Sequence, residues 1–162
     1  MKQYSDIIFP NGIIITRAAL ENLASFGSLD NITAEKSTLM DGMSESDVAV
    51  IDNTPAFINY AKAYRPKKIF VSDDDNELIS SGKDGSTFKY KNVEYFIPVV
   101  GVHQISNAIK AIELAEQLNI SAEDIKNGLM NFQQAIDRWV VDKYADDVEF
   151  ITDCPNNPSY NT

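Results

Sequence analysis

A single histidine and a single cysteine are the residues of this sequence best suited to acid–base or nucleophilic chemistry. Around His103 and Cys154 there is no serine–histidine–aspartate or cysteine–histidine spacing of the kind that activates a nucleophile. Cys154 has no basic neighbour in the sequence that would favour its thiolate, so we expect an inert thiol. Neither a metal-binding cluster nor a Gly-x-Gly-x-x-Gly turn occurs, which disfavours a small α/β enzyme of unrelated chemistry.

His103 stands at the start of the most regular stretch of the chain, residues 101–138, which predicts two helices. Ser121, followed three residues later by Asp124, is typical of the start of the second helix. In the first helix, apolar residues recur at steps of three and four and therefore share one face. The residues of that apolar face are Ile105, Ala108, Ile109, Ile112, Ala115 and Leu118. The residues of the opposite, polar face are Lys110, Glu113, Glu116 and Gln117. The apolar side of the second helix consists of Ile125, Leu129 and Phe132.

Short apolar runs in the first half of the chain predict the strands of a buried sheet at Gly12–Thr16, Asp47–Ile51 and Lys68–Val71. Between these runs, Ser28 is suited to begin one helix and Asn53 or Thr54 to begin the next, which would have Pro55 at its first position. An order of strand, helix, strand, helix, strand at this spacing is typical of βαβ units and a parallel sheet.

Residues 77–98 have a different pattern, with alternating apolar and polar positions and two turn signals, which indicates an antiparallel meander. Two further strands are expected near Trp139–Val141 and Val148–Thr152. We therefore predict an α/β fold, a three-layer domain with a mainly parallel sheet plus a small antiparallel β meander.

The composition restricts the partners of this domain. The 162 residues carry a formal net charge of -10, which disfavours nucleic acid and anionic membranes because phosphates attract lysine and arginine. No apolar run reaches the roughly 18 residues of a membrane span, and the N-terminus lacks the pattern of a signal peptide. One cysteine excludes an internal disulfide, so we expect a reducing, cytoplasmic setting.

Several motifs in their order and spacing resemble the Mur ligases, which are ATP-dependent amide-forming ligases best known from peptidoglycan precursor synthesis. The segment GVHQISNA at residues 101–108 is similar to the family's G-x-H-N-x-x-N-A helix start. FGSLDNITAEK at 26–36 and DCPNNP at 153–158 resemble two further family segments. The resemblance covers residues 13–158 and implies that 1–150 form part of the central ATPase domain. Residues 151–162 would then begin a linker to a C-terminal domain, and we expect this linker to fray.

The resemblance also implies roles for individual residues. Lys36 matches the family's carbamylated lysine, which helps hold metal ions, and Arg138 matches an arginine near the terminal phosphate, so both are candidate catalytic residues. Asn22 falls where the family has a metal-binding histidine and is a weaker candidate for Mg²⁺. Each has a plain alternative: Lys36 as a solvated helix residue and Arg138 as a partner of nearby aspartates.

Three residues are implied to bind the nucleotide. His103 corresponds to a histidine beside the base, Asp153 to an aspartate near the ribose, and Asn107 to an asparagine at the same helix start. His103 could equally be a helix-capping or surface histidine, and Asn107 could instead cap backbone groups.

The phosphate-binding loop of this family is missing from the sequence, since no G-x-x-x-x-G-K-[ST] occurs in it. The resemblance implies ATP and Mg²⁺ as cofactors, and we expect no catalysis unless a partner protein supplies the loop or the C-terminal domain. The alternative is a non-catalytic nucleotide-binding or scaffold domain derived from the family, in which no cofactor is needed.

Overall fold

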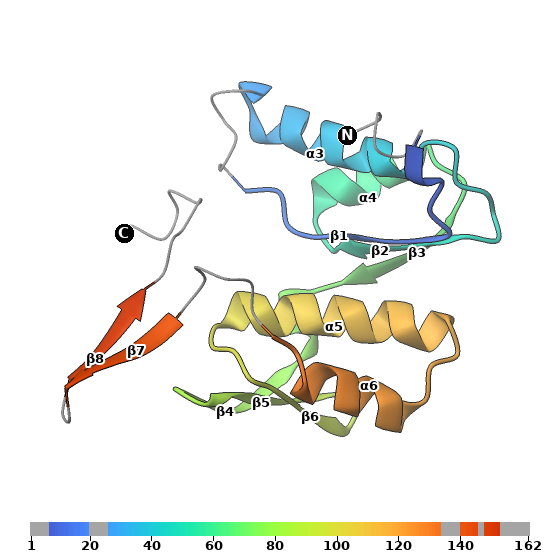
Figure 1. Cartoon of the computed structure of the whole chain (residues 1–162). Coiled ribbons are helices and arrows are strands. Elements are labelled where there is room, and N and C mark those ends of the chain that lie inside the picture. Colours follow the sequence, from blue (N-terminus) through green and yellow to red (C-terminus); the bar gives the residue numbers. More distant parts are fainter. Residues whose placement is uncertain (1–6, 20–25, 134–139, 146–147, 153–162) are drawn as a thin grey trace.

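The computed structural model describes residues 7–19, 26–133, 140–145 and 148–152 (Figure 1). Its first half is built on a parallel sheet of three strands in the order β1 (Gly12–Ile15), β2 (Val48–Asp52) and β3 (Lys67–Val71). Helices α3 (Leu29–Ser37) and α4 (Pro55–Ala61) lie on one face of this sheet, and a 3-10 turn, Thr38–Met40, follows α3. The register aligns the centres of the strands, with Ile14 opposite Val50 and Val50 opposite Ile69.

The second half is an antiparallel sheet covered by helices. Strands β4 (Glu77–Gly82), β5 (Gly85–Tyr90) and β6 (Val93–Ile97) pair in that order, after the 3-10 turn η3 (Asp73–Asp75). The remaining elements are α5 (Val102–Gln117), α6 (Ala122–Met130), β7 (Val140–Ala145) and β8 (Val148–Thr152). The predicted α/β layers, parallel sheet and meander are thus confirmed.

The long helix α5 lies between the two sheets and contacts all three parallel strands as well as β5 (Figure 1). Its side chains Ile105, Ile109 and Ile112 are at most 1% exposed and join one core with residues of both sheets. Because one helix fills the space between two sheets, more than one of its faces is buried.

This arrangement corrects the polar face predicted for α5. Lys110 is 1% exposed and Glu113 is 5% exposed, so neither lies on a solvated surface. The hydroxyl of Tyr90 donates to Glu113 Oε1 at 2.6 Å, and Lys91 forms an ion pair with the same carboxylate. Burial and this hydrogen bond raise the pKa of Tyr90 above its ordinary value of 10.0. Conversely, Leu118 and Phe132, expected on apolar faces, are 56% and 47% exposed.

The helix starts confirm the capping residues read from the sequence. Ser28 Oγ accepts from the backbone N–H of Asn31 at 3.1 Å, and Ser121 Oγ accepts from that of Asp124 at 3.1 Å. Thr54 caps α4, with Pro55 at the first helical position. Each cap satisfies a backbone donor that the first turn of a helix leaves unpaired.

We expect Ile109→Ala to lower the free energy of unfolding by about 2–5 kcal/mol, because Ile109 is fully buried and its truncation leaves a cavity. Chemical denaturation measures this change. Ile120→Ala is the matched control, since Ile120 lies just beyond α5 and is 43% exposed. Equal denaturation midpoints for the two variants would show that the packing of α5 does not anchor the core.

Asp47 joins the turn before β2 to the residue that precedes β1. Its carboxylate accepts from Asn11 Nδ2 at 2.8 Å and from the backbone N–H and hydroxyl of Ser44 at 2.6 and 2.8 Å. These hydrogen bonds, led by that from Asn11, hold the pKa of Asp47 below its ordinary value of 3.8.

A carboxylate with a lowered folded-state pKa stabilises the fold above its unfolded pKa, and this contribution is lost as pH falls through the folded pKa. We therefore expect the stability difference between the wild type and Asp47→Asn to be constant near neutral pH and to shrink below pH 3.8. Urea denaturation at a series of pH values measures it, with exposed Asp84→Asn as the control. A difference that stays the same into strong acid would contradict this role of Asp47.

Candidate functional site at the carboxyl edge of the parallel sheet

Parallel strands end at one edge of their sheet, and open α/β sheets bind ligands at that edge. Here Arg17 follows β1, Asp52 ends β2 and Asp73 follows β3. Helix α5 runs opposite to the strands. A Cβ added at Gly12, the first residue of β1, would lie 3.1 Å from Leu114 near the end of α5. The start of α5 therefore lies at the carboxyl edge.

A buried cation lies at the centre of this edge. Lys110 Nζ is 2.9 Å from Asp52 Oδ1 and donates to Ser106 Oγ at 2.5 Å. The Ser106 hydroxyl donates in turn to Asp73 Oδ1, which is 3.9 Å from Lys110 Nζ. Asp52 is 5% exposed, so the charge of Lys110 is compensated inside the protein rather than by water.

The same network extends to the surface and reaches a predicted site residue. Arg17 Nη1 lies 3.4 Å from Asp73 Oδ2, in an ion pair whose side chains are 73% and 50% exposed. The backbone carbonyl of Arg17 accepts from Lys36 Nζ at 2.7 Å. Lys36 on α3 and Lys110 on α5 are thus connected through Arg17, Asp73 and Ser106.

The nucleotide-binding residues expected on α5 lie at the same edge. His103 is the second residue of the helix, Asn107 follows one turn later, and both are exposed. Gly101 precedes the helix with a φ of 114°, and a Cβ there would lie 2.8 Å from His103 Cε1. A side chain at residue 101 would be strained and would displace the imidazole. Asn22, Arg138 and Asp153 lie outside the described residues, and their roles remain predictions.

The carboxylates at this edge do not form a magnesium site among the residues that the structure describes. Within residues 7–19 and 26–133, no group of three histidine, cysteine, aspartate or glutamate side chains is placed to hold a metal ion. Asp52 is buried against Lys110, and Asp73 pairs with Arg17. These carboxylates therefore do not form a Mg²⁺ cage, whereas His103 and Asn107 are exposed at the start of α5.

Sequence reasoning missed the centre of this edge. Asp52 directly follows the apolar run that ends at Ile51, and Asp73 lies two residues after the run that ends at Val71. Those positions were a signal available in the sequence. For Lys110 there was no such signal, because it falls on the face of α5 that appeared solvated.

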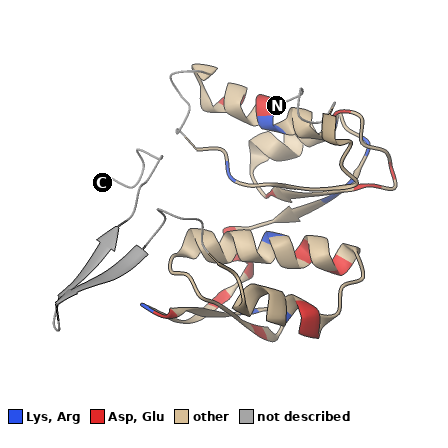
Figure 2. Cartoon of the chain, in the orientation of Figure 1, with Lys and Arg blue, Asp and Glu red and all other residues tan. Residues whose placement is uncertain are grey.

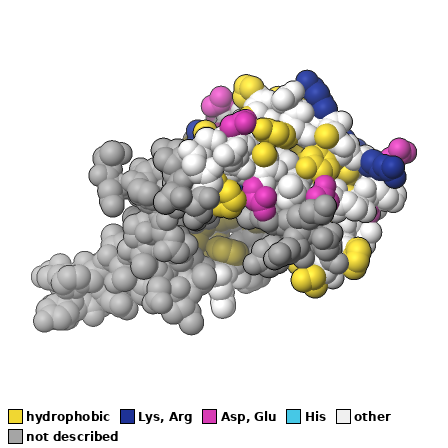
Figure 3. Space-filling view, turned by 90° about the horizontal axis from the view of Figure 1, so that it is seen from above, with side chains coloured by type: hydrophobic (Ala, Val, Ile, Leu, Met, Phe, Trp, Pro, Cys, Tyr) yellow, Lys and Arg dark blue, Asp and Glu magenta, His cyan; other side chains and the backbone are white. Residues whose placement is uncertain are grey.

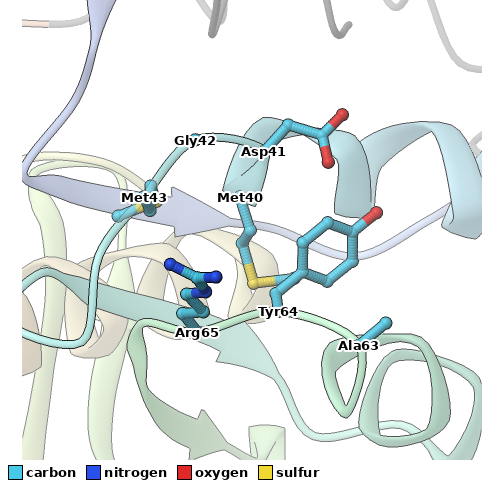
Figure 4. A pocket seen from close by; sticks show the side chains of 7 residues that line it. All are labelled: Met40, Asp41, Gly42, Met43, Ala63, Tyr64 and Arg65. Atoms are coloured by element: carbon cyan, nitrogen blue, oxygen red, sulfur yellow. The ribbon is translucent and has the colours of Figure 1, made fainter.

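A pocket lies at the opposite, amino edge of the parallel sheet, between the turn after α3 and the turn after α4 (Figure 4). Figure 4 shows the ring of Tyr64 beside the side chain of Met40. Burial, together with the charge of Asp41, raises the pKa of Tyr64. None of the predicted site residues lines this pocket.

In the part of the chain that the structure describes, the charged residues do not gather in one region (Figure 2). Acidic and basic residues are spread over both sheets and their helices (Figure 2). On the face seen in Figure 3, hydrophobic, acidic and basic side chains are interspersed. Among the described residues, no helix is both long enough and apolar enough to cross a membrane.

Comparison with known proteins identifies the family. A sequence model described as "Mur ligase middle domain" matches residues 1–115. The chain is 25% identical over 152 residues to the UDP-N-acetylmuramoyl-tripeptide--D-alanyl-D-alanine ligase of Bacillus subtilis, covering 91% of this chain and 33% of that protein. It is 33% identical over 140 residues to the ligase of the same name from Borreliella burgdorferi, covering 80% of this chain and 30% of that one.

Solved structures share the fold. A crystal structure of MurF from Acinetobacter baumannii superposes with a TM-score of 0.83 at 23% identity, covering 94% of this chain and 35% of that one. MurF ligase from Thermotoga maritima, crystallised in complex with ADP, gives a TM-score of 0.69 at 15% identity and covers 88% of this chain and 35% of that one. The chain spans about a third of the length of the relatives it matches. It belongs to the family of Mur ligase middle domains.

Proposed function

We propose that this domain serves an ATP-dependent carboxylate–amine ligase of the Mur type by forming the base and ribose side of the nucleotide site. In such a reaction ATP phosphorylates a carboxylate, and an amine then displaces phosphate from the acyl phosphate. The observation that carries the proposal is the position of His103 and Asn107, exposed at the start of α5 on the carboxyl edge of the sheet. The ligase names of the relatives and the ADP complex of one of them support it.

The phosphates must be held by groups from elsewhere. Phosphoryl transfer is catalysed mainly by positioning and charge stabilisation around the β- and γ-phosphates. A loop of the G-x-x-x-x-G-K-[ST] type would supply these contacts, and the 162 residues contain none. We propose that a partner protein or a further segment supplies this loop in a cytoplasmic assembly. ATP and Mg²⁺ would then act together with Lys36, Arg138 and Asp153.

One observation favours the alternative, a non-catalytic nucleotide-binding or scaffold domain. Lys36, expected to help hold metal ions, donates instead to the carbonyl of Arg17. An amine in this hydrogen bond would have to leave its acceptor before it could be carbamylated. In this alternative, base and ribose binding persists while metal-dependent chemistry does not.

Isothermal titration of the purified chain with ATP, ADP and AMP, with and without Mg²⁺, tests the proposal. We expect weak binding that tolerates loss of the γ-phosphate and gains little from Mg²⁺, because only one side of the site is present. His103→Ala and Asn107→Ala should each weaken binding about three- to tenfold, the loss of one or two hydrogen bonds. Asn127→Ala is the matched control, since Asn127 is an exposed asparagine on α6.

Two outcomes would oppose this proposal. If the His103→Ala, Asn107→Ala and Asn127→Ala variants bind nucleotide with equal affinity, the start of α5 is not part of the nucleotide site. Steady ATP turnover by the isolated chain, abolished by Lys36→Ala or Arg138→Ala, would instead show that the chain is an enzyme without added partners.

A further inference from the structure

The Asp52–Lys110–Ser106–Asp73 network is not used by the proposed function. Lys110 is 1% exposed, so its amine cannot contact a ligand that approaches from solvent. Its close partners, Asp52 Oδ1 at 2.9 Å and Ser106 Oγ at 2.5 Å, both lie inside the protein. No buried side-chain nitrogen or oxygen in the described part of the chain lacks a hydrogen-bond partner. A buried charge that touches no ligand costs desolvation energy and cannot bind the ligand directly. Any contribution it makes to ligand binding must therefore be indirect.

The location of the network suggests that contribution. Lys110 and Ser106 lie one turn apart on α5, and each bonds to the end of a different parallel strand: Lys110 to Asp52 of β2, and Ser106 to Asp73 after β3. The apolar residues of α5 alone would tolerate small rotations or shifts, because hydrophobic contacts are not directional. Hydrogen-bonded charges are directional and permit one register of the helix on the sheet.

The turn fixed in this way carries the candidate nucleotide contacts. Asn107 is the neighbour of Ser106, and His103 lies one turn before Asn107. Asp73 also pairs with the side chain of Arg17, and the backbone carbonyl of Arg17 accepts from Lys36 Nζ, so the network reaches Lys36. The network therefore connects the two parts of the candidate site, which come from α3 and from α5.

We propose that Lys110 is a positioning residue: with Asp52, Ser106 and Asp73 it fixes the first half of α5 on the carboxyl edge and so orients His103 and Asn107. This inference rests on the proposed function only in giving those two residues a nucleotide to bind. The positioning itself is a property of the free protein.

Two variants and a control separate positioning from general stabilisation. The double variant Lys110→Met with Asp52→Leu replaces the ion pair by apolar groups of similar size, which usually preserves folding. Ser106→Ala removes only the hydroxyl that joins Lys110 to Asp73. Ser86→Ala is the matched control, because its buried hydroxyl donates to the carbonyl of Val99, outside the network.

Three measurements apply to each variant: native-state hydrogen exchange along α5, the NMR signals of the imidazole, and the affinity for ADP. His103 is the single histidine of the chain, so its signals need no further assignment. We expect the amides of residues 106–110 to exchange at least tenfold faster in both network variants, relative to residues 112–117, and the imidazole signals to shift. ADP affinity should fall about as much as in His103→Ala, whereas Ser86→Ala should change none of these readouts.

Exchange that rises equally along all of α5, or imidazole signals that stay at their wild-type positions, would overturn the positioning role. If the double variant does not fold, Ser106→Ala alone decides, since it leaves the ion pair intact. If the wild type binds no ADP, the proposed function is wrong. Hydrogen exchange along α5 and the NMR signals of the imidazole still test the positioning role, because neither depends on ADP.

Discussion

Lys110→Met is expected to lower the free energy of unfolding by about 3–5 kcal/mol, one of the two largest effects that a single substitution should have in this domain. The substitution leaves the carboxylate of Asp52, 5% exposed, without the cation that lies 2.9 Å away. An unpaired buried charge retains its desolvation cost and loses the attraction that compensates it. Chemical denaturation at neutral pH measures the loss.

The expected loss comes from the unpaired charge, and a second substitution therefore tests the cause. Adding Asp52→Leu to Lys110→Met should restore most of the stability, because the pair is then replaced rather than broken. The matched control is Lys67→Met. The ammonium of Lys67 is exposed and donates to Gln117, so this substitution should change stability by no more than about 0.5 kcal/mol. If Lys110→Met behaves like Lys67→Met, the buried ion pair is not a structural feature of the protein in solution.

Phe88→Ala is expected to cost about 3–5 kcal/mol, since Phe88 is fully buried and truncation of a buried phenylalanine leaves a large cavity. Its ring is stacked with that of Tyr95, with centroids 5.8 Å apart, and both rings belong to the core that includes Val50 of the parallel sheet. The loss should therefore appear as one cooperative transition that includes both sheets. Denaturation followed by far-ultraviolet circular dichroism measures it.

Phe96→Ala provides the matched control on the neighbouring strand β6. Phe96 is 37% exposed and lies outside the buried core, so its truncation removes much less buried surface. Similar losses for the two variants would show that the buried face of the antiparallel sheet contributes no more to stability than the opposite face. A separate early transition in Phe88→Ala would show that the two sheets unfold independently.

Much of the fold could be predicted from local patterns. The apolar run that ends at Ile51 is strand β2, with its limits moved by one residue at each end, and residues 77–98 form the meander that their alternation indicated. Ser28, Thr54 and Ser121 begin helices because their side chains accept from backbone donors a few residues ahead. Such signals are short in range, so they can be read without knowledge of the rest of the chain.

The candidate site was predictable only in part. Resemblance to the family indicated Lys36, His103 and Asn107, and the structure places all three on elements that meet at the carboxyl edge. It did not indicate that Lys36 would donate to the carbonyl of Arg17, because that contact joins residues 19 positions apart. Asn22, Arg138 and Asp153 remain predictions, since they lie outside the described residues.

The sequence by itself determined the positions of strands and helices, the helix caps and the apolar stripe of α5. Only the tertiary structure decided that α5 is buried between two sheets, and hence that Lys110 and Glu113 are interior residues. The amphipathic reading of a helix assumes one buried face and one solvated face. A second sheet against the polar face invalidates that assumption, and the partners that make burial of those charges possible, Asp52 and Tyr90, lie on strands distant in sequence. Contacts of that range are fixed by how the elements pack, and no local pattern specifies them.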